Sequence, residues 1–103
     1  MDKPYKLGTI AHKTLTSGIK KLLTNQKFTN FLGFCFNDMK YNIWGEIEDA
    51  QRKTNYQNLY EGKTVIGKFT YEKISFYIIA YDKINGKRKA LVITAQEYER
   101  RTE

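Results

Sequence analysis

The pair Asn85-Gly86 constrains the fold more than any other feature, because it separates two β-type runs, KISFYIIAY and KRKALVITA. An Asn-Gly pair in this setting is the strongest short-range signal of a two-residue hairpin turn, since both turn positions need positive φ. A third run, KTVIGKFTY, precedes these two and ends at Glu72-Lys73. Residues 63–95 therefore predict a three-stranded antiparallel meander.

A two-residue turn also fixes the register of the second hairpin, placing Lys83 opposite Arg88 and Ile79 opposite Val92. Successive side chains of a strand alternate between faces, so one face is expected to belong to the core. Its members would be Phe76, Ile78, Ala80, Leu91, Ile93 and Ala95. The other face would present Tyr77, Ile79, Tyr81 and Lys83.

The N-terminal segment has the apolar spacing of an amphipathic helix over residues 7–23. Thr9 is a suitable N-cap for this helix, and Asn25 is a suitable end. Lysines recur at seven-residue intervals in the same region, a spacing that places helical residues on one face. The three that we consider further are Lys13, Lys20 and Lys27.

Residues 28–60 are ambiguous between strands and helices. The stretch KFTNFLGFCFNDMKYNIWGEI fits both periods, but its aromatic and β-branched content favours a hairpin. The stretch EDAQRKTNYQNLYEG is polar and predicts a surface helix or a long loop. The expected fold is thus a single α+β domain over residues 1–103, with the N-terminal amphipathic helix packed on an antiparallel meander of three to five strands. If residues 28–60 are helical instead, the layout resembles a winged helix with the 83–89 hairpin as its wing.

The net charge of +7 points to an anionic partner, and it is unevenly distributed. Residues 1–40 carry +5, residues 41–72 carry −1, and residues 73–103 carry +3. Charge gathered at the two ends indicates a nucleic-acid footprint better than it indicates general solubility. DNA is therefore the expected partner, with its single- or double-stranded state left open.

The candidate DNA-binding residues follow from this charge and from the hairpin. Four cations surround the hairpin tip, and two tyrosines behind them offer flat rings on which bases can stack. The predicted contacts are Lys83, Asn85, Lys87, Arg88, Lys89, Tyr77 and Tyr81, with Lys13, Lys20 and Lys27 on the helix. The competing interpretation is structural: lysines keep an edge strand from pairing with other chains, and the tyrosine face packs under the N-terminal helix.

No sequence motif indicates catalysis, a cofactor or a metal. His12 is the only histidine and Cys35 the only cysteine, so neither belongs to a motif of Cys and His ligands. The segment EGKT lacks the glycine that a phosphate-binding loop would need at Gln57. With a single cysteine and neither a signal peptide nor a membrane span, we expect a cytoplasmic location and no membrane partner.

The sequence therefore predicts a small, basic, non-enzymatic DNA-binding protein. A protein-binding accessory or inhibitor module is the alternative, since an exposed sheet can also dock a protein. A metal-independent RNase is a third hypothesis, because Lys, Arg, Tyr and Glu side chains suffice for acid–base and electrostatic help. Homodimerisation is left open.

Overall fold

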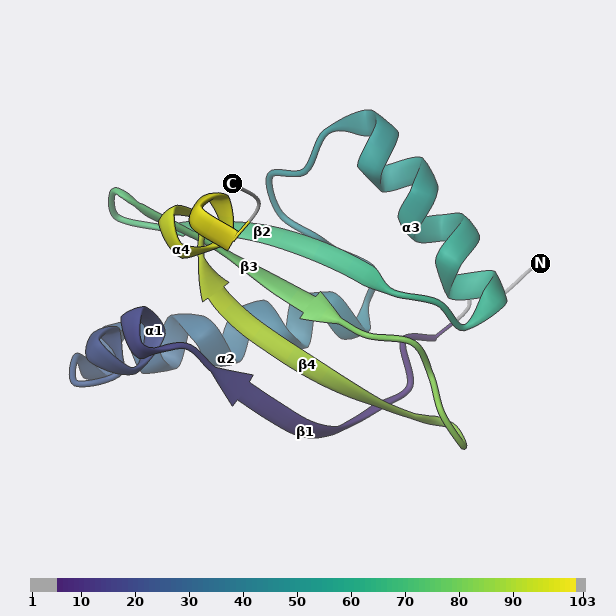
Figure 1. Cartoon of the computed structure of the whole chain (residues 1–103), viewed down its shortest axis with the longest axis horizontal. Coiled ribbons are helices and arrows are strands. Elements are labelled where there is room, and N and C mark those ends of the chain that lie inside the picture. Colours follow the sequence, from purple (N-terminus) through teal and green to yellow (C-terminus); the bar gives the residue numbers. More distant parts are fainter. Residues whose placement is uncertain (1–5, 102–103) are drawn as a thin grey trace.

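The computed structural model describes residues 6–101, which form a four-stranded mixed sheet and four helices (Figure 1). The predicted α+β class is confirmed. The strand order is β1-β4-β3-β2. In chain order the elements are β1 (Thr9–Leu15), α1 (Ser17–Leu22), α2 (Gln26–Lys40), α3 (Asp49–Glu61), β2 (Val65–Tyr71), β3 (Ile74–Ala80), β4 (Lys87–Thr94) and α4 (Ala95–Arg101).

The predicted antiparallel meander is present as β2, β3 and β4. Asn85 and Gly86 form the β3–β4 turn with φ of 52° and 77°, so both have the positive φ that this turn needs. β1 then extends the sheet by pairing with β4 in parallel. The sheet is therefore mixed, and not purely antiparallel as expected.

The register of the β3–β4 hairpin differs from the prediction by one residue. Ile79 pairs with Leu91 instead of Val92. The cause is a bulge, in which residues 81–83 stand against residues 88–89. A slip of one residue transfers each side chain of a strand to the other face, so Leu91 leaves the predicted core face and Val92 takes its place.

The predicted helix over residues 7–23 is wrong. Thr9 begins strand β1 instead of capping a helix, and only Ser17–Leu22 are helical in this segment. Parallel pairing with β4 provides partners for the backbone groups of β1, and this tertiary pairing overrides the local helical spacing. Asn25 does not end a long helix but caps α2, where its side chain accepts a hydrogen bond from Lys27 N at 2.8 Å.

The hairpin favoured for the stretch KFTNFLGFCFNDMKYNIWGEI is also wrong, because α2 occupies most of it. The surface helix predicted as one alternative for EDAQRKTNYQNLYEG is confirmed as α3. The buried side chains of α2 have helical spacing and are Phe28, Leu32, Cys35, Phe36 and Met39. Burial of this continuous apolar stripe against the sheet outweighs the strand preference of its aromatic residues. The winged-helix layout is not confirmed, since a strand precedes the helices and α2 lies along the sheet (Figure 1).

Amide side chains, more than an apolar stripe, hold α3 at the edge of the sheet. Asn55 is fully buried; it donates a hydrogen bond to Ile66 O at 2.8 Å and accepts one from Ile66 N at 3.1 Å. Asn58 donates to Thr64 O at 2.6 Å. Asn55 thus pairs with β2 as a neighbouring strand would, which protects this edge. Within residues 6–101, no helix combines the length and the apolar character needed to cross a bilayer.

Candidate nucleic-acid interface

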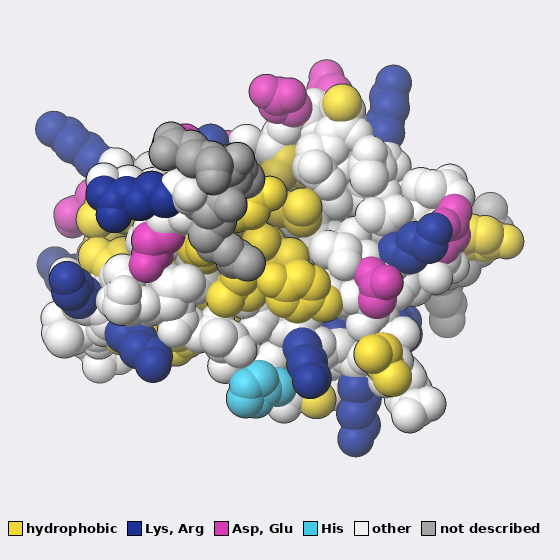
Figure 2. All heavy atoms as spheres, in the orientation of Figure 1, with side chains coloured by type: hydrophobic (Ala, Val, Ile, Leu, Met, Phe, Trp, Pro, Cys, Tyr) yellow, Lys and Arg dark blue, Asp and Glu magenta, His cyan; other side chains and the backbone are white. Residues whose placement is uncertain are grey.

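The two faces of the sheet are covered differently. The main core, which includes Phe28 of α2 with Phe76 and Ile78 of β3, lies on one face. The opposite face carries a smaller apolar cluster, and α4 lies in front of one end of it (Figure 1). We call this second face the open face; its side chains include Ile66, Lys68, Tyr77, Ile79, Tyr81, Lys87, Lys89, Leu91 and Ile93. Figure 2 shows apolar side chains gathered at its middle, with basic side chains along the lower border.

Both predicted tyrosines lie on the open face, but they differ in their neighbours. The ring of Tyr77 packs against Tyr98 of α4, with ring centroids 4.7 Å apart. Lys68 Nζ lies 5.7 Å from the centroid of Tyr77, in range of a cation–π contact. Tyr81 is 39% exposed and lies nearer the hairpin. Tyr77, Tyr98 and Lys68 thus form one cluster, and Tyr81 offers a second aromatic surface.

Sequence reasoning missed Lys68 and Tyr98 as members of this surface. Lys68 is the cross-strand partner of Tyr77, so extending the predicted register to the first hairpin would have found it. Tyr98 lies on α4, whose position over the open face has no signal in the sequence pattern.

The cations predicted at the hairpin do not act as one group. Lys87 and Lys89 are exposed and share the open face, since their side chains alternate with that of buried Ala90. Lys83 turns back toward the N-terminal segment, where its Nζ donates a hydrogen bond to Lys6 O at 3.4 Å. Asn85 is exposed at the tip. The structure therefore brings two of the four hairpin cations to the open face.

Arg88 is buried, with an exposed fraction of 1%. Its Nε donates to Leu7 O at 2.6 Å, and its Nη1 donates to Lys63 O at 2.6 Å and to Tyr81 O at 2.8 Å. Burial lowers the pKa of Arg88 and the charge of Asp82 opposes this shift, but a guanidinium stays protonated in proteins. Arg88 thus joins three segments of the chain and is not an exposed phosphate contact.

The three lysines expected on one helical face lie on three different elements. Lys13 is in β1, and its Nζ lies 4.4 Å from the centroid of the Phe36 ring of α2. Lys20 is exposed in α1, and Lys27 is exposed at the start of α2. They form no common stripe with the hairpin lysines.

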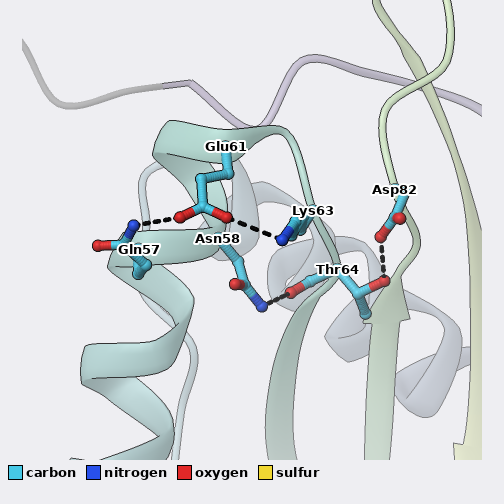
Figure 3. Close-up of polar contacts among 6 residues, drawn as sticks. All are labelled: Gln57, Asn58, Glu61, Lys63, Thr64 and Asp82. Carbon is cyan, nitrogen blue, oxygen red and sulfur yellow. Dashed lines mark hydrogen bonds and ion pairs between the residues drawn. The ribbon is translucent and has the colours of Figure 1, made fainter.

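A cavity of about 640 Å³ lies beside the hairpin, and we call it the hairpin cavity. It is lined by Ala11, His12, Thr64, Tyr81, Asp82, Ile84, Lys87, Arg88 and Lys89. Figure 3 shows Asp82, on the segment after β3, facing Thr64 before β2; Thr64 Oγ1 donates to Asp82 Oδ1 at 2.7 Å. Beyond Thr64, Asn58 and the ion pair of Lys63 with Glu61 connect this wall to α3. The hairpin cavity therefore has a hydrogen-bonded wall on one side.

Within the described residues, neither a metal-binding cluster nor a reactive cysteine is found. Across residues 6–101, no group of three or more His, Cys, Asp or Glu side chains is placed to hold a metal ion. Burial, and to a smaller extent the charge of Asp38, raises the pKa of the Cys35 thiol to about 12, which keeps it protonated and unreactive.

Comparisons of the chain with protein-family models, curated protein sequences and solved structures find no match.

Proposed function

We propose that the protein binds single-stranded nucleic acid on the open face, with DNA as the first candidate, and acts as a non-enzymatic binding protein. The observation that carries this proposal is the composition of the open face. Tyr77 and Tyr98 pack on the smaller apolar cluster with Lys68 beside them, and Tyr81 lies nearer the hairpin with Lys87 and Lys89. Stacking rings together with cations that follow a phosphate backbone are the general features of single-strand binding.

Single strands fit this surface better than a duplex does. In a duplex the base faces are stacked on each other and cannot reach a tyrosine ring, whereas unpaired bases can. Proteins that recognise duplex DNA usually insert a helix into its major groove. Here α2 packs its apolar stripe on the sheet, and α3 is hydrogen-bonded to the edge of β2 through Asn55. Neither helix is presented as a free recognition helix.

The expected energies are modest but sufficient. Each base stacked on an aromatic ring contributes about 1–3 kcal/mol. Each neutralised phosphate adds about 0.7 to the slope of log affinity against log salt for a single strand. Three lysines therefore account for a slope of about 2 on the open face.

The test is fluorescence anisotropy with a labelled single-stranded oligonucleotide and the matching duplex across a salt series. The open-face variant replaces Lys68, Lys87 and Lys89 by Gln. The matched control replaces Lys20, Lys27 and Lys40 by Gln, which removes the same charge from exposed positions on α1 and α2. We expect the wild type to prefer the single strand, and the open-face variant to lose a slope of about 2.

Two outcomes would contradict the proposal. Equal losses in the open-face variant and the control would mean that the net charge matters and the open face does not. Binding weaker than about 0.1 mM for both strand states, below ordinary non-specific affinity, would redirect the open face to a protein partner.

A further inference from the structure

We infer that the outer edge of β1 and the neighbouring flank of α2 bind an extended acidic peptide segment of a partner protein, which adds a strand to the sheet. This site is separate from the open face and does not depend on nucleic-acid binding there. Among residues 6–101, β1 forms one border of the sheet and pairs only with β4, so its outer edge has no strand beside it (Figure 1). Addition of a strand to such an edge is a general mode of peptide recognition.

The two edges of the sheet differ in how they are protected. At the β2 edge, Asn55 of α3 occupies the backbone groups of Ile66. At the β1 edge most side chains of the strand are exposed, and residues 12–15 pair regularly with β4 after the bulge. Lys13 lies in this regular part, and an edge lysine discourages pairing with apolar or basic strands. The same lysine favours a strand that carries carboxylates, so the edge is selective and not merely blocked.

A groove of about 420 Å³ lies between the β1 segment and one flank of α2, and we call it the edge groove. It is lined by Gly8, Thr9, Ile10, Lys13, Gly33, Phe36, Asn37 and Lys40. Every second side chain of an added strand would point to the α2 side of the sheet. The edge groove can receive these side chains, since its volume lies in the range of about 300–1,000 Å³ typical of ligand sites.

The edge groove is positively charged and accessible. Its lining contains Lys13 and Lys40 and no described acidic residue, and both lysines are exposed. Within residues 6–101, neither lysine forms an ion pair. The Nζ atom of Lys13 lies 4.4 Å from the centroid of the Phe36 ring, a contact that holds this ammonium at the groove. Carboxylates of a partner strand would meet these charges, whereas a second copy of the chain would bring like charges together.

Gly33 keeps the edge groove open at a position where the fold itself does not need glycine. It lies inside α2, where glycine is less favourable than alanine. A Cβ atom at Gly33 would meet no other atom within 4 Å, so packing within the chain does not exclude a side chain. The missing side chain instead widens the groove and allows another backbone to approach α2 closely. This is the second observation that points to a peptide ligand.

The first test uses fluorescence anisotropy with a labelled seven-residue peptide that matches the length of β1 and alternates valine with glutamate. Both ends of the peptide are capped to remove their charges. The comparison peptide carries lysine at each glutamate position. We expect the glutamate peptide to bind the wild-type protein about ten-fold tighter than the lysine peptide, because like charges at an interface are unfavourable.

Two N-methylated forms of the glutamate peptide test whether binding uses strand pairing. Each carries three N-methyl groups, in one form on valines and in the other on glutamates. Alternate N–H groups of a strand point to opposite edges, so only one of the two patterns removes donors that face β1. We expect that pattern to weaken binding about ten-fold more than the other, since three hydrogen bonds are lost.

Variants of the protein locate the peptide in the edge groove. Lys13/Lys40→Gln should weaken binding of the glutamate peptide about five-fold, as expected for two exposed ion pairs. Gly33→Glu should weaken it at least as much, because its side chain narrows the groove and repels the peptide. Gly33→Ala is the matched control, and it should bind like the wild type and be no less stable in urea. The open-face variant should retain binding within about two-fold, since its three lysines do not line the edge groove.

Several results would overturn the inference while leaving the proposed function intact. Equal binding of the glutamate and lysine peptides, equal effects of the two methylation patterns, or no binding at about 1 mM peptide would each do so. Loss of the peptide in the open-face variant alone would move its site to the open face. A dimer in sedimentation experiments that Gly33→Glu dissociates would assign the edge to a second copy. The peptide comparisons on the wild type decide the matter even if a variant does not fold.

Discussion

Arg88 lies where three segments of the chain meet, since it donates hydrogen bonds to the carbonyl oxygens of Leu7, Lys63 and Tyr81. Arg88→Ala would leave these buried and partly buried carbonyls with fewer partners and open a cavity at the base of the hairpin. Hydrogen bonds to a charged group contribute about 1.5–3 kcal/mol each, and they are not additive. We therefore expect the free energy of unfolding, measured by urea titration, to fall by about 3 kcal/mol.

Two further variants sharpen this expectation. Arg88→Lys should recover little of the loss, because an ammonium on a flexible stem cannot reproduce the fork of a guanidinium. Lys87→Ala, which removes an exposed neighbouring charge, should change stability by less than about 1 kcal/mol. If Arg88→Ala lowers the free energy of unfolding by a similarly small amount, the three contacts contribute little to stability.

The sequence could not distinguish Arg88 from its neighbours, because the four cations around the turn carry no signal of which one is buried. Only the register decides which of them point inward, and the bulge at residues 81–83 shifts that register by one. Asn85 was predictable, since the positive φ of a tight turn selects its residue type locally. Local backbone demands are thus visible in the sequence, while the burial of a single side chain depends on distant partners.

Helices α1 and α4 begin beside each other, and one carboxylate caps both. Glu97 accepts hydrogen bonds from Gly18 N at 3.1 Å and from Thr16 Oγ1 at 2.6 Å at the start of α1. At the start of α4 it accepts from Thr94 N at 3.1 Å, while its own N–H donates to Thr94 Oγ1 at 3.1 Å. The second pair is a capping box. Glu97 therefore connects two elements that lie far apart in the sequence.

This double cap predicts a pH-dependent stability. Burial by itself would raise the pKa of Glu97, but the hydrogen bonds from Thr16, Thr94 and Gly18 lower it from 4.5 to about 2. Because the folded-state pKa is the lower one, the stabilisation is complete above pH 4.5 and is lost as the pH falls toward about 2. Glu97→Gln should lower the free energy of unfolding by about 1 kcal/mol at neutral pH.

The measurement is a set of urea titrations between neutral and acidic pH. The difference between wild type and Glu97→Gln should shrink as the pH falls below 4.5. Glu48→Gln is the control, since this residue precedes α3 without a side-chain cap hydrogen bond. A difference that stays constant with pH would mean that the Glu97 carboxylate is not the source of the stabilisation.

Helices and strands were predictable where neighbouring residues in the sequence carry the pattern that determines them. The meander was found from period-two runs and turn pairs, and each strand contacts its sequence neighbour. β1 was mistaken for a helix because its partner, β4, lies at the other end of the chain. α3 had no apolar stripe to reveal how it docks, since Asn55 attaches it by its amide. What the sequence did not reveal therefore depends on contacts between distant segments.

At the scale of the whole molecule, the candidate surface is separated from the main core by the sheet. Trp44, the only tryptophan, is fully buried in that core, and its ring packs edge-on against Tyr56 of α3 with centroids 4.9 Å apart. The proposed ligand contacts lie on the open face. The charge asymmetry of the sequence indicated a polyanion partner, but it could not indicate which face of the sheet remains open.

Because the candidate surface and Trp44 lie on opposite sides of the sheet, the effect of a bound strand on unfolding can be predicted. A ligand that binds only the folded state stabilises it by about 2.7 kcal/mol at a concentration of 100 Kd. We expect a saturating single strand at low salt to raise the free energy of unfolding by this amount. Emission of Trp44, which reports unfolding, should keep its native position on binding because the ligand does not reach it. High salt should remove the stabilisation, since phosphate contacts are screened.

The Lys68/Lys87/Lys89→Gln variant provides the decisive control, because these cations lie on the open face while Trp44 belongs to the core on the other side. Its unfolding without ligand should resemble that of the wild type, as expected for exposed or half-exposed lysines. Its response to the strand should be much smaller. If the strand instead shifts the native emission of Trp44, or stabilises both proteins equally, the ligand engages the molecule elsewhere. Binding would then belong to the helical side, and the open face would have to serve another partner.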